Sequence, residues 1–326
     1  MARTDSSLSM PEPQKGESID VEDAFVTLRE MRVHGAGRIA RLAATALKDY
    51  AKSCSAPNRD DLYKSILTAG ERLKSARPTA VSLPNGVDYV LAGPKKAYDD
   101  GGSSEDIRSA TISAGENFVR ESTEAMTIIG EIGAKRIRNG DVLLTHCNSE
   151  AAISVLKTAH DQGKGIKVFN SETRPKYQGH KTAVALAKHG IDVTMIVDSA
   201  VRRFMDNIDK VVVGADAITV NGAVVNKIGT SQIATVAHEA RVKVMVAAET
   251  YKFDPKTING DLVEIEERDP LEVCSKEVLD AYPNLKIRNP VFDITPPEYI
   301  DVLITEKGIV PPGGVFLMMR EIFNIK

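Results

Sequence analysis

The sequence predicts an α/β protein in which a helical N-terminal domain precedes a Rossmann-like, doubly wound and mostly parallel sheet. Through most of residues 21–137, apolar residues recur three and four positions apart, which is the period of amphipathic helices. After Gly140, short β-branched runs alternate with helical segments, and this alternation is typical of βαβ units around a parallel sheet. We therefore predict a helical domain over residues 21–138 and an α/β domain over residues 139–326.

Bulk properties exclude several classes of protein. The first 20 residues contain no apolar run and indicate a disordered tail. The sequence also contains no stretch of about 18 apolar residues, the length that a membrane-spanning helix needs. A net charge of -3 provides no general attraction for nucleic acid or an anionic membrane. Cys54, Cys147 and Cys274 are odd in number and widely spaced, which fits a reducing compartment better than a disulfide framework. We expect a cytoplasmic protein with neither nucleic-acid nor membrane partners.

The helical pattern is clearest in VEDAFVTLREM, in ARLAATALKDYA and in TISAGENFVRESTEAMTIIGEIGAKRI. Proline, glycine and polar clusters interrupt it at residues 77–86 and 99–106, which we interpret as loops between helices. In the second half, strands are predicted at DVLLT, IKVF, DVTMIV, KVVVGA, KVMVAA and YIDVLITE. The sequence ITVNGAVV places Asn-Gly between apolar pairs, so a small antiparallel hairpin is expected there.

Polar residues directly follow most of the predicted strands. In an open parallel sheet, ligands bind beyond the carboxyl ends of the strands, so we expect these residues to gather on one edge. They are His146–Ser149, Asn170–Arg174, Asp198–Ser199, Asp216 and Glu249–Lys252.

Cys147 lies between a predicted strand and a helix that Asn148 or Ser149 could cap. The positive end of that helix would favour thiolate over thiol, which makes Cys147 a candidate base. A lone cysteine is about as often a small buried apolar residue. Asp216 lies among small apolar residues, where burial would keep its carboxyl protonated as a candidate acid, the alternative being an aspartate that caps the next turn.

Asn226, Lys227 and Lys252 are candidates for neutralising a phosphate, although isolated lysines are more often solvated. The segment HGAGRIAR, residues 34–41, imitates a dinucleotide-binding motif but follows a helix rather than a strand. Its glycines, with Arg38 and Arg41, suit an anion site or else a simple helix break, and Arg77 allows the same two interpretations. The histidines show no metal-ligand spacing, so no metal is predicted.

These residues carry a specific resemblance. The segments RPTAVSLPN, GDVLLTHCNSEAAISVLKTA, ETRPKYQG, GADAITVNGAVVNKIGT, AAETYKF and NPVFDITPPEYIDVLITE resemble the ribose-1,5-bisphosphate isomerases from about Ala36 to Pro312. This family is shared with methylthioribose-1-phosphate isomerases and with the alpha, beta and delta regulatory subunits of initiation factor 2B. Fold-level likeness alone does not decide among their functions.

The resemblance implies conversion of α-D-ribose 1,5-bisphosphate into D-ribulose 1,5-bisphosphate, with Cys147 and Asp216 as the catalytic pair. It also implies no cofactor, AMP as an activator, and a homohexamer built as a trimer of dimers. His34 departs from the arginine that the family often has before Gly-Ala-Gly. The residues that the resemblance places on the substrate are His34, Gly35, Ala36, Gly37, Arg38, Arg77, Ser149, Asn226, Lys227 and Lys252.

Two alternatives follow from the same resemblance. A methylthioribose-1-phosphate isomerase would use the same pair, but those enzymes usually have Cys-Asn-[Thr/Ala]-Gly where this chain has Cys147 followed by Asn-Ser-Glu. A non-catalytic regulatory subunit would generally lack the pair, and its retention argues against that alternative.

Overall fold

The chain separates into two compact units, residues 1–123 and 124–326, in a computed structural model that describes residues 18–260 and 263–323. Helix α5 (Ser104–Ala134) contributes its first part to one unit and its last turns to the other. The predicted domain boundary at residue 139 assigns all of this helix to the helical domain. Most of the predicted N-terminal tail, residues 1–17, lies outside the described residues.

The first unit is helical, as the apolar periodicity predicts. Two of its helices begin at polar caps: the Asp20 carboxylate accepts hydrogen bonds from the Glu22 and Asp23 N–H groups, and Asn58 caps the third helix. Such caps satisfy N–H groups that have no partner within the helix. The helices in chain order are α1 (Val21–Arg29), α2 (Ala36–Ser53), α3 (Arg59–Lys74), α4 (Ser82–Asp99) and α5 (Ser104–Ala134).

The loop predicted over residues 77–86 is too long, because α4 already begins at Ser82. Pro84 lies in the first turn of the helix, where the missing N–H has no intrahelical partner to lose. Proline here therefore marks the start of a helix. The second predicted loop is confirmed, although α5 begins inside it at Ser104.

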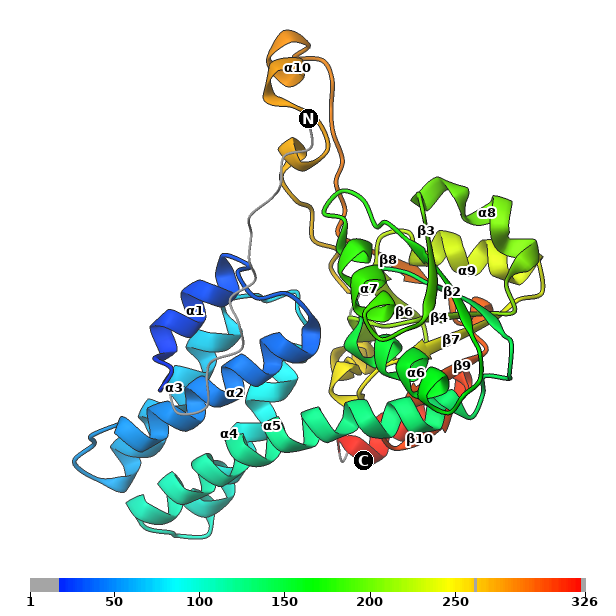
Figure 1. Cartoon of the computed structure of the whole chain (residues 1–326). Coiled ribbons are helices and arrows are strands. Elements are labelled where there is room, and N and C mark those ends of the chain that lie inside the picture. The colour runs from blue at the N-terminus through cyan, green and yellow to red at the C-terminus, as the bar shows by residue number, and fades with distance from the viewer. Residues whose placement is uncertain (1–17, 261–262, 324–326) are drawn as a thin grey trace. The chain divides into compact units, whose positions relative to one another are not determined.

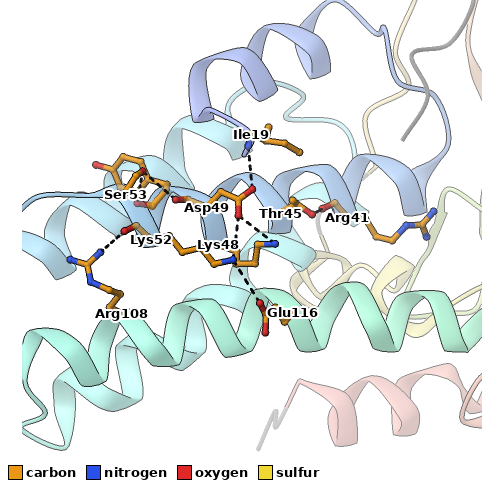
Figure 2. A network of polar contacts seen from close by, with 10 residues as sticks. Ile19, Arg41, Thr45, Lys48, Asp49, Lys52, Ser53, Arg108 and Glu116 are labelled. Carbon is orange, nitrogen blue, oxygen red and sulfur yellow. Dashed lines mark hydrogen bonds and ion pairs between the residues drawn. The ribbon is translucent and has the colours of Figure 1, made fainter. Parts of the chain in front are cut away.

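A buried carboxylate ties the helices of this unit together (Figure 2). Asp49 of α2 accepts a hydrogen bond from the Ile19 N–H at 3.1 Å and pairs with Lys48 and Lys52. Lys52 also reaches Glu116 of α5 at 3.8 Å. The network connects the chain entering α1 with α2 and α5, so the burial of Asp49 has a structural explanation.

The second unit contains the predicted parallel sheet, in the strand order β10-β9-β7-β4-β1-β2-β3 (Figure 1). All neighbours are parallel except β10, which pairs with β9 in the antiparallel sense. The six predicted strands are confirmed. Their bounds are β1 (Val142–Thr145), β2 (Lys167–Ser171), β3 (Asp192–Ile196), β4 (Lys210–Val213), β7 (Lys243–Ala247), β9 (Val302–Thr305) and, beyond the prediction, β10 (Gly308–Val310).

Apolar residues alternate between two cores, one on each face of the sheet. Val211 and Val213 of β4 enter the core that α9 and α11 cover, whereas Val212 enters the core under α6 and α7. The sheet is therefore doubly wound, as predicted. The helices of this unit that follow α5 are α6 (Glu150–Asp161), α7 (Gln178–Ala187), α8 (Val201–Phe204), α9 (Thr230–Glu239), α10 (Lys276–Ala281) and α11 (Val315–Ile322).

The hairpin predicted at Asn-Gly is confirmed and forms part of a second, antiparallel sheet. Strands β5 (Ala217–Ile218) and β6 (Val224–Lys227) pair across a turn in which Gly222 has a φ of +83°, a conformation that glycine adopts readily. The partner strand β8 (Phe292–Thr295) was not predicted. It follows an arm, carrying α10, that extends away from the sheet (Figure 1). Among the described residues, no helix is both long and apolar enough to cross a membrane.

Candidate active site

The strand order defines where a ligand should bind. From β1 the sheet continues to β2 and β3 on one side, and from β4 it continues to β7 and β9 on the other. The neighbours β1 and β4 therefore form the topological switch point, beyond whose carboxyl ends an open α/β sheet binds its ligand. Cys147 follows β1 and Asp216 follows β4, so the two predicted catalytic residues flank this crevice.

The turn after β1 is held in an uncommon conformation. Cys147 has a φ of +64°, and non-glycine residues in this left-handed region are often found at functional sites. Its N–H donates to the Thr173 hydroxyl oxygen at 2.9 Å, and its carbonyl accepts a hydrogen bond from the Thr182 hydroxyl at 2.7 Å. Both sides of the Cys147 backbone are therefore fixed.

Ser149 caps helix α6, as one of the two predicted caps, by accepting a hydrogen bond from the Ala152 N–H at 3.3 Å. It also lies against the end of β4, because a β-carbon added to Gly214 would come within 2.3 Å of the Ser149 hydroxyl oxygen. Glycine at position 214 thus lets the start of α6 approach the strand that leads to Asp216.

The Cys147 thiol does not have the lowered pKa that its place before a helix predicts. Burial raises the pKa of this thiol to about 11, Lys227 opposes the increase, and Asp216 adds to it. The predicted preference for thiolate is therefore wrong. Desolvation of the sulfur outweighs the helix terminus.

Lys227 is the cation of this cluster. It is 8% exposed, and burial lowers its pKa, while the charges of Cys147 and Asp216 act in the opposite direction. Its Nζ atom lies 4.9 Å from the centre of the Phe292 ring. The structure therefore brings together Cys147, Asp216 and Lys227. Neighbouring Asn226 is buried and donates to the Thr230 hydroxyl oxygen at 2.9 Å.

His146 supports the cluster as a neutral, buried side chain. Its Nε2 lies 2.8 Å from the Ile228 carbonyl oxygen, which can only accept, so Nε2 carries the proton. Its Nδ1 then accepts from the Ser171 hydroxyl at 2.5 Å. Burial lowers the pKa of His146, which favours this neutral form.

Lys252 is buried at the carboxyl end of β7, in the turn Thr250–Lys252. Its Nζ lies 2.6 Å from a carboxylate oxygen of Glu249, whose other oxygen accepts a hydrogen bond from Tyr251. The charge of Lys252, a predicted phosphate ligand, is therefore compensated by Glu249. The sequence placed Glu249 at this edge but assigned it no role.

The remaining predicted ligands belong to the helical unit. Gly35, with a φ of +96°, precedes α2, whose first turn contains Ala36, Gly37 and Arg38. The Ser82 hydroxyl donates to the Ala36 carbonyl at 3.0 Å, so the start of α4 contacts this turn. Arg77 lies in the segment that leads into α4. His34 precedes it and is exposed. Helix α1 rather than a strand comes before the turn, which confirms that the dinucleotide motif is only an imitation.

Arg268 is a site residue that the sequence did not reveal. Its positive charge acts on both the Cys147 thiol and Lys227, lowering the pKa of each. Residues just before β8 pair with the segment that contains Arg268: the Val291 N–H donates to the Glu266 carbonyl and the Arg268 N–H donates to the Asn289 carbonyl. The arm between β7 and β8 therefore brings a second cation to the thiol.

Replacing Lys227 by methionine is expected to slow alkylation of Cys147 by iodoacetamide roughly tenfold at a fixed pH near 8.5. Because the positive charge lowers the pKa of the thiol, its loss leaves less thiolate, and one pKa unit corresponds to about tenfold. Mass spectrometry of the Cys147 peptide measures the rate. Lys243→Met, at the amino end of β7, is the control and should leave the rate unchanged. Unchanged alkylation in Lys227→Met would contradict the electrostatic coupling.

A Rossmann-like sheet with a thiol, a carboxyl and a buried lysine at its switch point has the fold of an α/β enzyme. The sequence model of the Initiation factor 2 subunit family matches residues 32–312, and the chain belongs to this family. It is 54% identical to the ribose 1,5-bisphosphate isomerase of Methanocaldococcus jannaschii over 93% of this chain and 96% of that protein.

Other relatives have different names. A methylthioribose-1-phosphate isomerase of Acetivibrio thermocellus is 37% identical over 90% of this chain and 88% of that protein. Among solved structures, the translation initiation factor eIF-2B of Pyrococcus horikoshii OT3 superposes with a TM-score of 0.76 at 32% identity, covering 90% of this chain and 97% of that one. The family is therefore shared by isomerases and initiation factors, and the site has to decide between them.

Proposed function

We propose that this protein is a ribose 1,5-bisphosphate isomerase that converts α-D-ribose 1,5-bisphosphate into D-ribulose 1,5-bisphosphate. The observation that carries the proposal is the arrangement of Cys147 and Asp216 on the two strands of the switch point, beside the buried Lys227. A pair able to donate and accept protons suits isomerisation and has no evident use in a purely regulatory subunit. Relatives that share about half of its residues carry the name of this enzyme.

Asp216 acts as the acid in the first step. The phosphate on C1 prevents the sugar ring from opening to a free aldehyde, so the ring oxygen must be protonated as its bond to C1 breaks. A carboxylic acid positioned at that oxygen supplies the proton, and such positioned transfers typically contribute about 10² to 10⁴ in rate.

Cys147 acts as the base in the second step. It removes the C2 proton to give a cis-phosphoenolate as the C2 hydroxyl gives its proton to the Asp216 carboxylate. Return of the proton from sulfur to C1 then completes the ketone and restores the thiolate and the carboxylic acid. Although the resting thiol has a pKa of about 11, part of that increase comes from the charge of Asp216. A proton on Asp216 removes this charge and leaves Lys227 and Arg268 to stabilise the thiolate. The acid and the base are therefore produced together by moving one proton from sulfur to carboxylate.

For the phosphates, the proposal keeps the predicted ligands. Asn226 and Lys227 lie beside the catalytic pair, and Lys252 lies beyond the next strand end. Within the helical unit, Arg77 and the turn His34–Arg38 stay predictions: they provide cationic side chains and the first-turn N–H groups of α2, features that bind phosphate oxygens.

The deciding experiment compares two substrates. Purified protein treated with a chelator should convert α-D-ribose 1,5-bisphosphate into a product that ribulose-bisphosphate carboxylase consumes, and should convert methylthioribose 1-phosphate far more slowly. A preference for methylthioribose 1-phosphate would assign the protein to the other isomerase. Activity on neither compound would overturn the proposal in favour of a regulatory subunit.

The proposal includes regulation and assembly. AMP should increase the rate of the same assay, and light scattering should give the mass of a hexamer arranged as a trimer of dimers. Both features rest on the family resemblance. No AMP effect, or a different mass, would remove them while leaving the isomerase assignment intact.

A further inference from the structure

Two turns at the carboxyl edge of the sheet share the same uncommon backbone conformation. Cys147 after β1 has a φ of +64°, and Thr173 after β2 also has a φ of +64°. For a β-branched residue such as threonine this is a genuine outlier, and neighbouring structure must hold it in place. Since β1 and β2 are adjacent and parallel, the two turns lie next to each other.

Asp198 holds the second turn. It follows β3, the neighbour of β2, and its carboxylate accepts hydrogen bonds from the Thr173 N–H at 2.8 Å and the Arg174 N–H at 2.7 Å. Hydrogen bonds from N–H groups to a charged acceptor are stronger than neutral ones. The carboxylate thereby stabilises two successive peptide groups in a turn that would otherwise be unfavourable.

Thr173 in turn holds the backbone of Cys147. Its side chain is fully buried, and its Oγ1 accepts the Cys147 N–H at 2.9 Å. The same oxygen lies 3.3 Å from the Ser171 carbonyl, which accepts its proton, because the Ser171 hydroxyl already occupies the His146 Nδ1 lone pair. A hydroxyl that accepts on one side and donates on the other has its orientation fixed.

We propose that Thr173, held by Asp198, is a positioning residue that keeps the Cys147 backbone left-handed and so aims the sulfur into the crevice between β1 and β4. Neither residue needs to touch the substrate. The inference rests on the proposed function for its meaning in catalysis, but the geometry of the thiol can be tested without any substrate.

The functional prediction follows from how steeply proton transfer depends on geometry. A misplacement of about 1 Å can cost about 10²-fold in rate. Thr173→Val preserves the branched shape and removes only the hydroxyl, so we expect kcat to fall about 10²-fold with KM nearly unchanged. Thr173→Ser restores the hydroxyl and should recover most of the rate. Asp198→Asn presents an N–H₂ group to one of two N–H donors and should resemble Thr173→Val.

Alkylation of Cys147 by iodoacetamide, followed by mass spectrometry in the full-length protein, provides the independent measurement. A released turn lets the sulfur leave its enclosed position, so the alkylation rate should rise in Thr173→Val and Asp198→Asn but not in Thr173→Ser. Thr111→Val is the matched control. It removes one buried hydroxyl that donates to the Ile107 carbonyl in the helical unit, and it should change neither rate.

Wild-type kcat and alkylation in Thr173→Val would overturn the inference, as would an equal loss in Thr173→Ser. If the wild-type protein isomerises neither sugar phosphate but alkylation responds as expected, the proposed function fails while the positioning role stands.

Discussion

Cys147→Ser is expected to lower kcat for α-D-ribose 1,5-bisphosphate by about 10² to 10⁴. A serine hydroxyl fits where the thiol is, because it is smaller and keeps the same backbone hydrogen bonds to Thr173 and Thr182. It is, however, a far weaker acid than a thiol, so it cannot form the anion that removes the C2 proton. The coupled assay measures the loss, and deuterium incorporation at C1 of the product in deuterium oxide should fall in parallel.

The other two cysteines are the natural controls. Cys54 and Cys274 are also half-buried and free, but neither follows a strand of the parallel sheet. Cys54→Ser and Cys274→Ser should retain wild-type kcat. If Cys147→Ser keeps most of the activity, or if either control loses as much, the assignment of the base is wrong.

The position of Cys147 could be predicted from the sequence, but the pKa of its thiol could not. The order of strand, Cys147 and capped helix could be predicted, because it depends on local patterns that each recur along the chain. The pKa of the thiol could not, since it is set by the burial of the sulfur and by Lys227 and Asp216, which lie far away in sequence. A helix terminus acts within one turn, whereas desolvation depends on everything that packs around the site.

The same distinction between local patterns and long-range packing explains which parts of the fold could be predicted. Short β-branched runs that alternate with helical segments predicted the doubly wound sheet, and the Asn-Gly pair predicted the β5–β6 hairpin. The strand β8 that completes this second sheet was missed, because an arm of irregular segments separates it from β7 and its residues are only partly buried. Arg268 was missed for the same reason. The local sequence around Arg268 does not show that this segment pairs with the residues just before β8 and so returns to the thiol.

Thr173 and Asp198 were found only as polar residues after strands, which is the general signal for an edge where ligands bind. Their roles depend on one hydrogen bond between adjacent turns and on a positive φ that threonine rarely adopts. A glycine there would have been visible in the sequence. A strained threonine was not, because propensity predicts the opposite conformation.

Asp216→Asn is expected to change activity and thiol reactivity in opposite directions. The amide cannot protonate the ring oxygen, so kcat should fall by about 10² to 10⁴. The negative charge of Asp216 also contributes to the raised pKa of Cys147, so its removal should lower that pKa and accelerate alkylation of the cysteine by iodoacetamide. A variant that loses activity merely by unfolding would expose all three cysteines equally, and mass spectrometry of the separate peptides distinguishes the two cases.

The matched control for this variant is Asp209→Asn, which changes an aspartate at the amino end of β4, where its carboxylate accepts the Val142 N–H at 2.8 Å. It should alter neither kcat nor alkylation of Cys147, since it lies at the opposite edge of the sheet. Slower alkylation in Asp216→Asn would mean that the carboxyl does not act on the sulfur as a negative charge. The exchange of one proton between thiol and carboxylate would then fail as the origin of the thiolate, because that exchange requires each group to sense the charge of the other.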